Sequence, residues 1–193
     1  MMRLAGICVA SLLSISSNAE EFAGQIVTVS GKVLSRNENT KTTQLILLKS
    51  GDKIYEGSVV NTGPQGTAKL LMADRTIIDL GPASVFKVNE FKLNQVSNRT
   101  VEMELKQGQM RASVNKPVPD PSGKFSVKTR AATMGVRGTE FIVKAPALSD
   151  QPNAPIPPSQ ITVIKGLVAV TDGSAAGGAN AVNLSAGMQV NRG

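Results

Sequence analysis

Apolar and polar residues alternate with a period of two through much of this chain, and this limits the fold more than any other feature. The alternation is clearest in Thr67–Met72 and Val101–Lys106. Successive side chains of a β-strand point to opposite faces of a sheet, so the pattern predicts strands with one buried face. Val101–Lys106 also contains good helix formers, but its strict alternation favours a strand with Glu102 and Glu104 on the solvent side.

Glycine, proline and other turn-forming residues interrupt the pattern every 8 to 12 residues or so, a spacing typical of sandwiches, barrels and rolls. The sequence therefore predicts an all-β fold, a single domain of two packed antiparallel sheets arranged as a sandwich or a flattened β-roll. A solenoid-like stack is the alternative. The other segments expected to be strands in the first half of the chain are Ile26–Val33 (bent at Gly31), Thr43–Leu48, Ser58–Asn61, Thr76–Leu80 and Val85–Phe91.

Composition supports the same fold class. The chain of 193 residues has 20 Val, 11 Ile and 13 Thr, the β-branched residues that strands favour. Its aromatic residues are only five Phe and one Tyr, so the core is expected to be mainly aliphatic.

A weak internal echo links four glycines, each of which follows or interrupts an expected strand. Their spacing is too irregular for a regular repeat. Glycine tolerates positive φ, so we expect a tight turn or bulge at each of them. These glycines are Gly31, Gly108, Gly166 and Gly187.

Three segments are expected to be loops within this single domain. Residues 116–123 and 145–159 hold eight of the ten prolines, which cannot donate to a strand ladder. Residues 173–180 are small and uncharged.

The first residues resemble a secretory signal. Arg3 precedes an apolar run of about a dozen residues, and small residues up to Ala19 offer a cleavage site. The run is short for a membrane span, although an uncleaved anchor is the alternative. We therefore expect a cleaved signal at 1–19, a periplasmic β domain at 20–193, and no transmembrane span in the mature chain. Cys8 follows Ile7 rather than a small residue, so we do not expect a lipoprotein.

Composition also excludes several kinds of chemistry. With no His and one Cys, the chain has no His-based triad, no imidazole metal site and no internal disulfide. The net charge of +7 suits anionic partners, but the basic cluster at 124–137 has no interleaved aromatics for base stacking. We expect no nucleic acid partner, no cofactor and no metal.

Paired carboxylates are the only residues that suggest an enzyme, because they can act in general acid–base catalysis. Asp74 and Asp79 lie five residues apart across an expected hairpin, and Glu102 and Glu104 share a strand face. Carboxylates in such positions are usually solvated, so we expect no catalytic residues and no enzyme. Calcium binding by Asp52, Asp74 or Asp79 would need a denser oxygen cluster.

Residues 129–141, with the sequence TRAATMGVRGTEF, carry a specific resemblance. This segment is similar to the signature of the FecR domain family, which reads T-P-x-A-x-x-G-V-R-G-T-x-F. Residues 49–63, 66–70, 74–80 and 105–110 resemble further ordered segments of that family, so the likeness covers most of the chain after the signal. Arg130 stands where the family often has proline.

The resemblance implies a role in binding. FecR-type proteins usually join a cytoplasmic anti-sigma region, a membrane span and a periplasmic domain that senses an outer-membrane receptor. We expect this chain to be a free periplasmic FecR-domain protein that binds an envelope protein, such as an outer-membrane receptor or regulator, in signalling or transport. An envelope structural or anionic-glycan-binding module is the alternative. The binding residues that the signature suggests are Thr129, Arg130, Gly135, Arg137, Gly138, Thr139 and Glu140.

The role of Arg137 is open at this stage. In one interpretation it lies in a bulged turn and bonds nearby carbonyls or pairs with Glu140; in the other its planar guanidinium contacts an acidic group on a partner. Phe141 heads an apolar strand and is expected in the core.

Overall fold

A computed structural model describes residues 21–40, 44–93, 99–115, 123–149, 154–172 and 181–193, and these form sixteen β-strands and no helix. The expected signal segment and the expected loop at 173–180 lie outside the described residues, as does the loop at 116–123 except for Gly123. Within the described ranges, there is no helix of the length and apolarity that a membrane crossing requires. The all-β prediction is confirmed.

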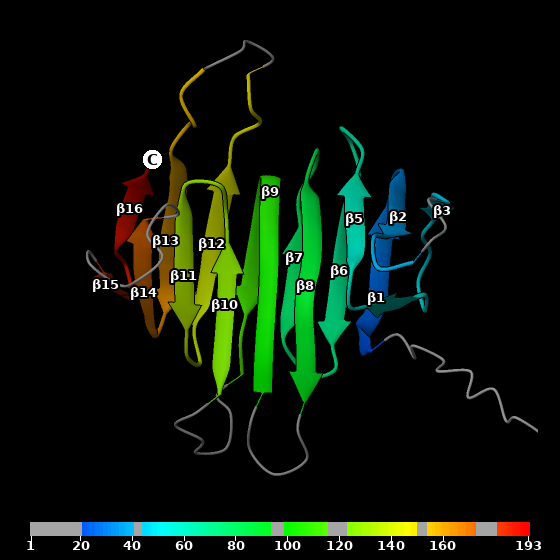
Figure 1. Ribbon diagram of the computed structural model, residues 1–193, viewed down its shortest axis with the longest axis horizontal. Coiled ribbons are helices and arrows are strands. Elements are labelled where there is room, and N and C mark those ends of the chain that lie inside the picture. The colour runs from blue at the N-terminus through cyan, green and yellow to red at the C-terminus, as the bar shows by residue number, and fades with distance from the viewer. Residues whose placement is uncertain (1–20, 41–43, 94–98, 116–122, 150–153, 173–180) are drawn as a thin grey trace, which may run out of the picture.

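The strands form two layers that lie one behind the other in Figure 1 and share the long strand β9 (Arg99–Ser113). Layer A has the order β4 (Lys53–Tyr55), β1 (Phe22–Ser30), β6 (Thr67–Met72), β7 (Ile77–Leu80), β9, β12 (Glu140–Ala145), β13 (Ser159–Lys165) and β16 (Gln189–Arg192). Layer B has the order β3 (Ile46–Leu47), β2 (Val33–Asn37), β5 (Ser58–Thr62), β8 (Val85–Leu93), β9, β10 (Lys124–Lys128), β11 (Ala132–Val136), β14 (Leu167–Asp172) and β15 (Val182–Ser185).

The chain passes repeatedly from one layer to the other and advances along the long axis, from β1–β4 at one end to β13–β16 at the other (Figure 1). Within the described residues each layer ends in two edge strands: β4 and β16 in layer A, and β3 and β15 in layer B. The structure thus combines the predicted packing of two sheets with the gradual advance of a stack.

Glycines supply most of the corners where the chain changes layer. The four glycines of the internal echo have φ between 68° and 95°, so the expectation of positive φ is confirmed. Gly108 shows why no other residue fits. A Cβ there would lie 2.2 Å from Ser84 Oγ, because the corners before β8 and within β9 are stacked on each other.

One strand pair departs from the predicted antiparallel arrangement. At Gly108 strand β9 leaves layer B and runs back in layer A in the opposite direction. Ser113 therefore lies near the level at which β9 began. The chain then starts β10 beside the beginning of β9, and the two strands run parallel, with Lys124 opposite Thr100. Among the described strands, this pair is the exception to the predicted antiparallel sheets.

The core lies between the layers and is filled by the inward side chains of both. Most of it is aliphatic, as expected, but its largest fully buried side chains include Phe86, Phe91 and Phe141. The prediction that Phe141 is a core residue is therefore confirmed. In β9, Val101, Met103 and Leu105 are buried while the intervening glutamates are half-buried on the outer face.

Strand positions follow the sequence closely except at Thr43–Leu48 and Ile26–Val33. Thr43 lies outside the described residues, and strand β3 contains only Ile46 and Leu47. The expected single strand Ile26–Val33 is two strands, β1 and β2, since the chain changes layer at Gly31.

Candidate functional site

The two ends of β11 separate the residues of the FecR-like signature. Thr129 and Arg130 precede the strand, and Arg137 and Gly138 follow it. At about 3.3 Å per strand residue, Arg130 and Arg137 lie roughly 20 Å apart. The residues expected from the signature therefore do not form one site.

Thr129 is buried and stabilises the turn between β10 and β11. Its Oγ1 accepts a hydrogen bond from the Ala132 amide at 3.0 Å, and the Ser159 hydroxyl donates to the same oxygen at 2.9 Å. Arg130 is exposed at the tip of this turn. Thr129 therefore has a structural role.

Gly135 and Gly138 differ in backbone conformation. Gly138 has φ of 62°, which favours glycine, and it lies in the corner between β11 and β12. Gly135 lies inside β11 without a positive φ, and an added Cβ there would make only an ordinary contact, 3.9 Å from Ala169. The signature thus needs backbone freedom after Arg137 but not before it.

Thr139 joins two neighbouring corners. Its buried hydroxyl donates a hydrogen bond to the Leu167 carbonyl at 2.8 Å, which connects the β11–β12 corner to the β13–β14 corner. Gly166 has φ of 90°, and a Cβ there would lie 2.9 Å from Thr139 Oγ1. The signature residue Thr139 therefore packs against position 166 only if that position is glycine.

Glu140 pairs with Arg111, not with Arg137. Arg111 Nε donates to Glu140 Oε1 at 2.9 Å, and this ion pair raises the pKa of Arg111. In the β12–β13 ladder the register shifts beside Glu140, because Ile164 of β13 has no partner in β12. The interpretation that pairs Arg137 with Glu140 is wrong, because a different arginine occupies that carboxylate.

Arg137 is exposed, and its side chain has no hydrogen-bond or ion-pair partner among the described residues. The register of β10 with β11, extended by two residues, places Lys124 opposite Arg137. Lys165 is the partner of Glu140 in the β12–β13 ladder and is also exposed. Neither lysine has a side-chain partner within the described ranges. Three uncompensated cations therefore share one edge of the molecule.

Exposed apolar side chains lie among these cations. The register of β11 with β14 places Leu167 next to Arg137, and the Val163 amide bonds the Met188 carbonyl at 3.0 Å, which brings in the β15–β16 corner. Ile164, Leu167 and Met188 are each about half exposed. We call this group of side chains the signature edge: Lys124, Arg137, Ile164, Lys165, Leu167 and Met188.

The acidic residues considered for catalysis are largely bound to cations. Asp79 pairs with Lys69 at 2.6 Å, and Glu102 pairs with Lys128 at 2.7 Å. Asp74 accepts from Arg99 at 2.7 Å in a nearly buried pair. Among the described residues no group of three or more His, Cys, Asp or Glu could hold a metal ion.

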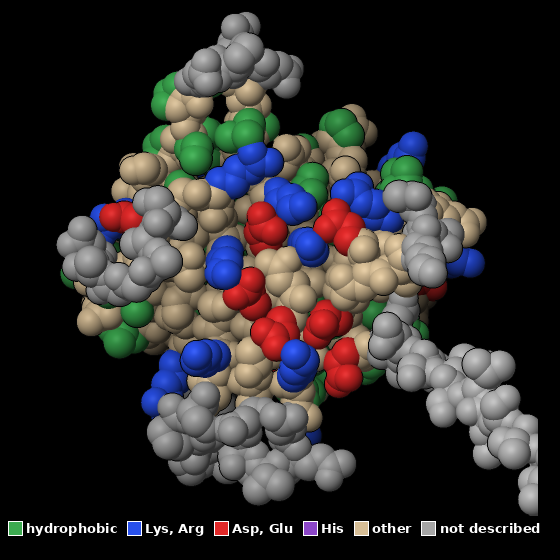
Figure 2. Space-filling model, viewed as in Figure 1, with side chains coloured by type: hydrophobic (Ala, Val, Ile, Leu, Met, Phe, Trp, Pro, Cys, Tyr) green, Lys and Arg blue, Asp and Glu red, His purple; other side chains and the backbone are tan. Residues whose placement is uncertain are grey.

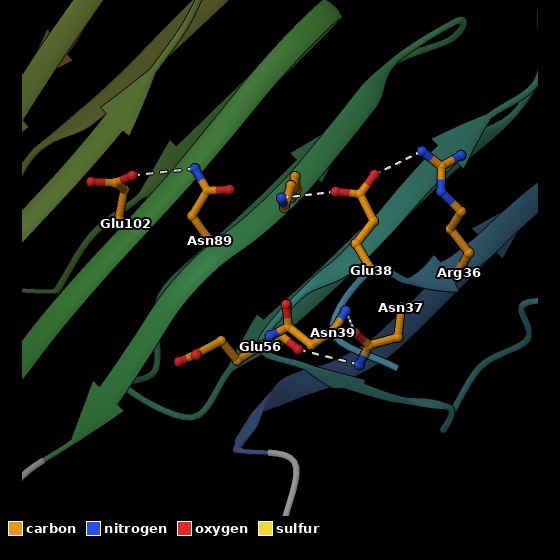
Figure 3. Close-up of polar contacts among 8 residues, drawn as sticks. Arg36, Asn37, Glu38, Asn39, Glu56, Asn89 and Glu102 are labelled. Atoms are coloured by element: carbon orange, nitrogen blue, oxygen red, sulfur yellow. Dashed lines mark hydrogen bonds and ion pairs between the residues drawn. The ribbon is translucent and has the colours of Figure 1, made fainter. Parts of the chain in front are cut away.

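The outer face of layer B carries interspersed acidic and basic side chains over its centre (Figure 2). In one network, Glu38 bonds Lys87 and Arg36, each at 2.8 Å, and Figure 3 shows Arg36 and Glu38 pointing toward one another. These two cations lower the pKa of Glu38 from 4.5 to about 2. Most of the charged side chains named on this face are paired, in contrast to the cations of the signature edge.

Two features of the structure were not expected from the sequence. Thr62 and Ser84 form a buried hydroxyl network, in which Ser84 N donates to Thr62 Oγ1 at 2.8 Å. Arg99 also lies over the Phe125 ring, 5.0 Å from its centroid. Thr62 is followed by a glycine, and the V-R-G-T segment at 136–139 also joins a threonine to a glycine. A threonine beside a glycine is therefore the sequence signal for a corner that is held by a buried hydroxyl.

Comparison with protein families identifies the chain. The sequence profile described as "FecR protein" matches residues 58–169, more than half of the chain, and the chain belongs to this family. The match contains the signature and most of the strands that support its corners.

Comparison with solved structures gives two crystal structures of a candidate anti-sigma factor from Parabacteroides distasonis ATCC 8503. Each is 20% identical in sequence, with TM-scores of 0.46 and 0.47. The matches cover 69% of this chain and 58% of that chain. A search of curated proteins gives no match.

Proposed function

We propose that this chain is an exported, periplasmic FecR-family protein that has no enzymatic activity and binds another envelope protein in signalling or transport. Membership of the FecR family supports a regulatory role, and the signal-like pattern of residues 1–19 supports export. The cation-bound carboxylates support a binding role rather than a catalytic one. An outer-membrane receptor or an envelope regulator is the proposed class of partner.

The signature edge is the observation that carries the proposal. Thr139, Gly138 and Gly166 fix the corners, whereas Arg137 is exposed and unpaired among the described residues. Buried signature residues thus hold the corners in place, and the corners present cations and apolar side chains to solvent. Arg can bind a carboxylate through two parallel hydrogen bonds, and the adjoining Leu167 supplies apolar area.

A photo-crosslinking amino acid at Leu167 tests the proposal in intact cells. We expect a discrete crosslinked protein, lost when Arg137→Glu is added. The matched control places the crosslinker at Ile77, which is similarly exposed but lies on the outer face of layer A. Equal crosslinking from both positions, or none from Leu167, would contradict the proposal.

An anionic-glycan-binding module is the second candidate, favoured by the three uncompensated cations of the signature edge. Retention of the purified protein on isolated cell wall, abolished by Arg137→Glu, would support it in place of a protein partner. The proposed location is tested separately by periplasmic fractionation, with N-terminal sequencing expected to begin at Glu20.

A further inference from the structure

The end of the molecule opposite the signature edge has two open strand edges. Strand β3 closes layer B and strand β4 closes layer A, and Figure 1 places them far along the long axis from β14 and β16. Among the strands that the structure describes, β3 pairs with β2 alone, through Leu34–Leu47 and Ser35–Ile46. Unpaired strand edges can accept an extended segment from another chain.

The side chains around β3 are unusually apolar for an exposed edge. Leu45, Ile46 and Leu47 are 59%, 55% and 60% exposed, and they are consecutive in the chain. Protein edges usually avoid such exposure by means of charge, proline or a bulge. Leu48, the next residue, is buried and attaches this strand to the core.

Two concave surfaces border this strand. A pocket of about 470 Å³ extends from β2 across β3 to β4, and its lining includes Ser35, Ile46, Leu47, Lys49, Lys53 and Tyr55. A second hollow of about 520 Å³ lies beside Leu45 and Arg36. Side chains of a strand added at β3 can therefore enter a recess.

Basic side chains at the pocket favour a partner segment with acidic side chains. The side chains of Lys49 and Lys53 have no ion-pair or hydrogen-bond partner in the part of the chain that the structure describes. Arg36 is held by Glu38, and the Asp52 carboxylate accepts a bond from the Lys49 amide at 2.9 Å. Two cations without an ion-pair partner thus border the groove, together with the single carboxylate of Asp52, so the groove carries a net positive charge.

From these observations we infer that the β3–β4 end is a second binding site, which takes an extended segment of a partner protein with alternating apolar and acidic side chains. The segment adds a strand to β3, its apolar side chains enter the pocket, and its carboxylates pair with Lys49 and Lys53. This inference is independent of the signature edge. A protein with both sites can bind two partners at once, one at each end.

A selection from a displayed library of random ten-residue peptides tests the inference. The full mature protein is the bait, and the Ile46→Asp variant serves for counter-selection. We expect enriched peptides that alternate apolar residues with Asp or Glu, and that lose at least tenfold in affinity for Lys49→Glu/Lys53→Glu. Peptides of another composition, peptides that bind the counter-selection variant equally, or no enrichment would overturn the inference.

Tyr55 provides a label-free second readout, because it lines the pocket and the chain has one Tyr and no Trp. An enriched peptide lacking Tyr and Trp should change tyrosine fluorescence saturably. Ile77→Asp is the matched control, an equal change on an exposed apolar residue of layer A, and should leave peptide affinity unchanged. Concentration-dependent self-association that Ile46→Asp abolishes would show that the occupant is a second copy and overturn the inference.

Discussion

Thr139 donates a hydrogen bond from its hydroxyl to the carbonyl of Leu167 at 2.8 Å, across 28 residues of sequence. This contact connects the corner that exposes Arg137 with the corner that exposes Leu167. It follows that the signature combines buried residues that fix the corners with exposed residues that are available for binding. The two groups should respond differently to substitution.

Thr139→Val should lower the free energy of unfolding by about 1 kcal/mol, because it removes a buried hydroxyl while keeping its shape. Thr133→Val is the control, since the half-buried Thr133 hydroxyl makes no hydrogen bond among the described residues. Urea unfolding followed by circular dichroism measures both. Equal losses in the two variants would show that the Thr139 bond contributes nothing specific.

Arg137→Ala should change the free energy of unfolding by less than about 0.5 kcal/mol, because this exposed side chain has no partner in the described part of the chain. Thermal unfolding of the purified variant checks this directly. A loss comparable to that of Thr139→Val would place Arg137 with the structural residues and weaken the proposed binding role of the signature edge.

Gly108→Ala should be more destabilising than Gly51→Ala. Both glycines have positive φ, 95° and 90°, but a Cβ at Gly51 meets no atom within 4 Å. Gly51→Ala therefore isolates the backbone cost of about 1 kcal/mol, whereas Gly108→Ala adds a clash with Ser84. The difference between their denaturation midpoints measures the stacking of the corners, and no difference would mean that the corners relax freely.

These corners show which structural features could be predicted from the sequence. The echo around Gly31, Gly108, Gly166 and Gly187 predicted positive φ correctly, because only the local backbone decides that property. Which corners stack is a non-local fact. Gly108 meets Ser84 and Gly166 meets Thr139 only after the layers have assembled.

The strands show the same difference between local properties, which the sequence predicts, and non-local ones, which it does not. Alternation located β6 and β7 within a residue, since one face of each is buried. It failed at Thr43–Leu48, where consecutive apolar residues have no alternation and β3 is exposed on the edge. The parallel pairing of β10 with β9 follows from the change of layer at Gly108, which periodicity does not report.

The candidate site was only partly predictable. The family resemblance identified Arg137 and Thr139, but nothing in the sequence separated the exposed residue from the buried one. The pairing of Glu140 with Arg111, 29 residues away, depends on the ladder between β12 and β9. Lys124 and Lys165 reach the signature edge through the same kind of non-local pairing.

Asp74→Ala should lower the free energy of unfolding by about 3 kcal/mol, because it leaves Arg99 charged and nearly buried without its partner. The side chains of Arg99 and Asp74 are only 12% and 3% exposed. Asp79→Ala breaks a pair whose side chains are 45% and 39% exposed, so its loss should stay below about 1 kcal/mol. Similar losses in the two variants would show that burial does not strengthen the Arg99–Asp74 pair.

Glu38 should contribute to the acid unfolding of the protein. Lys87 and Arg36 lower its pKa from 4.5 to about 2, so the folded state binds the proton more weakly than the unfolded state. The contribution is therefore fully present above about pH 4.5 and is lost as the pH falls toward 2. Because Glu38 is partly solvated, we expect it to amount to about 1 kcal/mol.

Glu38→Gln should reduce stability at neutral pH by that amount and make the decline between pH 4.5 and 2 shallower. Urea unfolding at a series of pH values measures the slope, and 0.5 M salt should reduce the difference between the two proteins to roughly half, because partly exposed charges are screened. Glu104→Gln is the control, a half-buried glutamate on the same outer face that has no ion-pair partner among the described residues. Parallel acid limbs for the native protein and Glu38→Gln would show that the Lys87–Glu38–Arg36 network does not stabilise the fold, because a carboxylate with a lowered pKa must give up its contribution in this range.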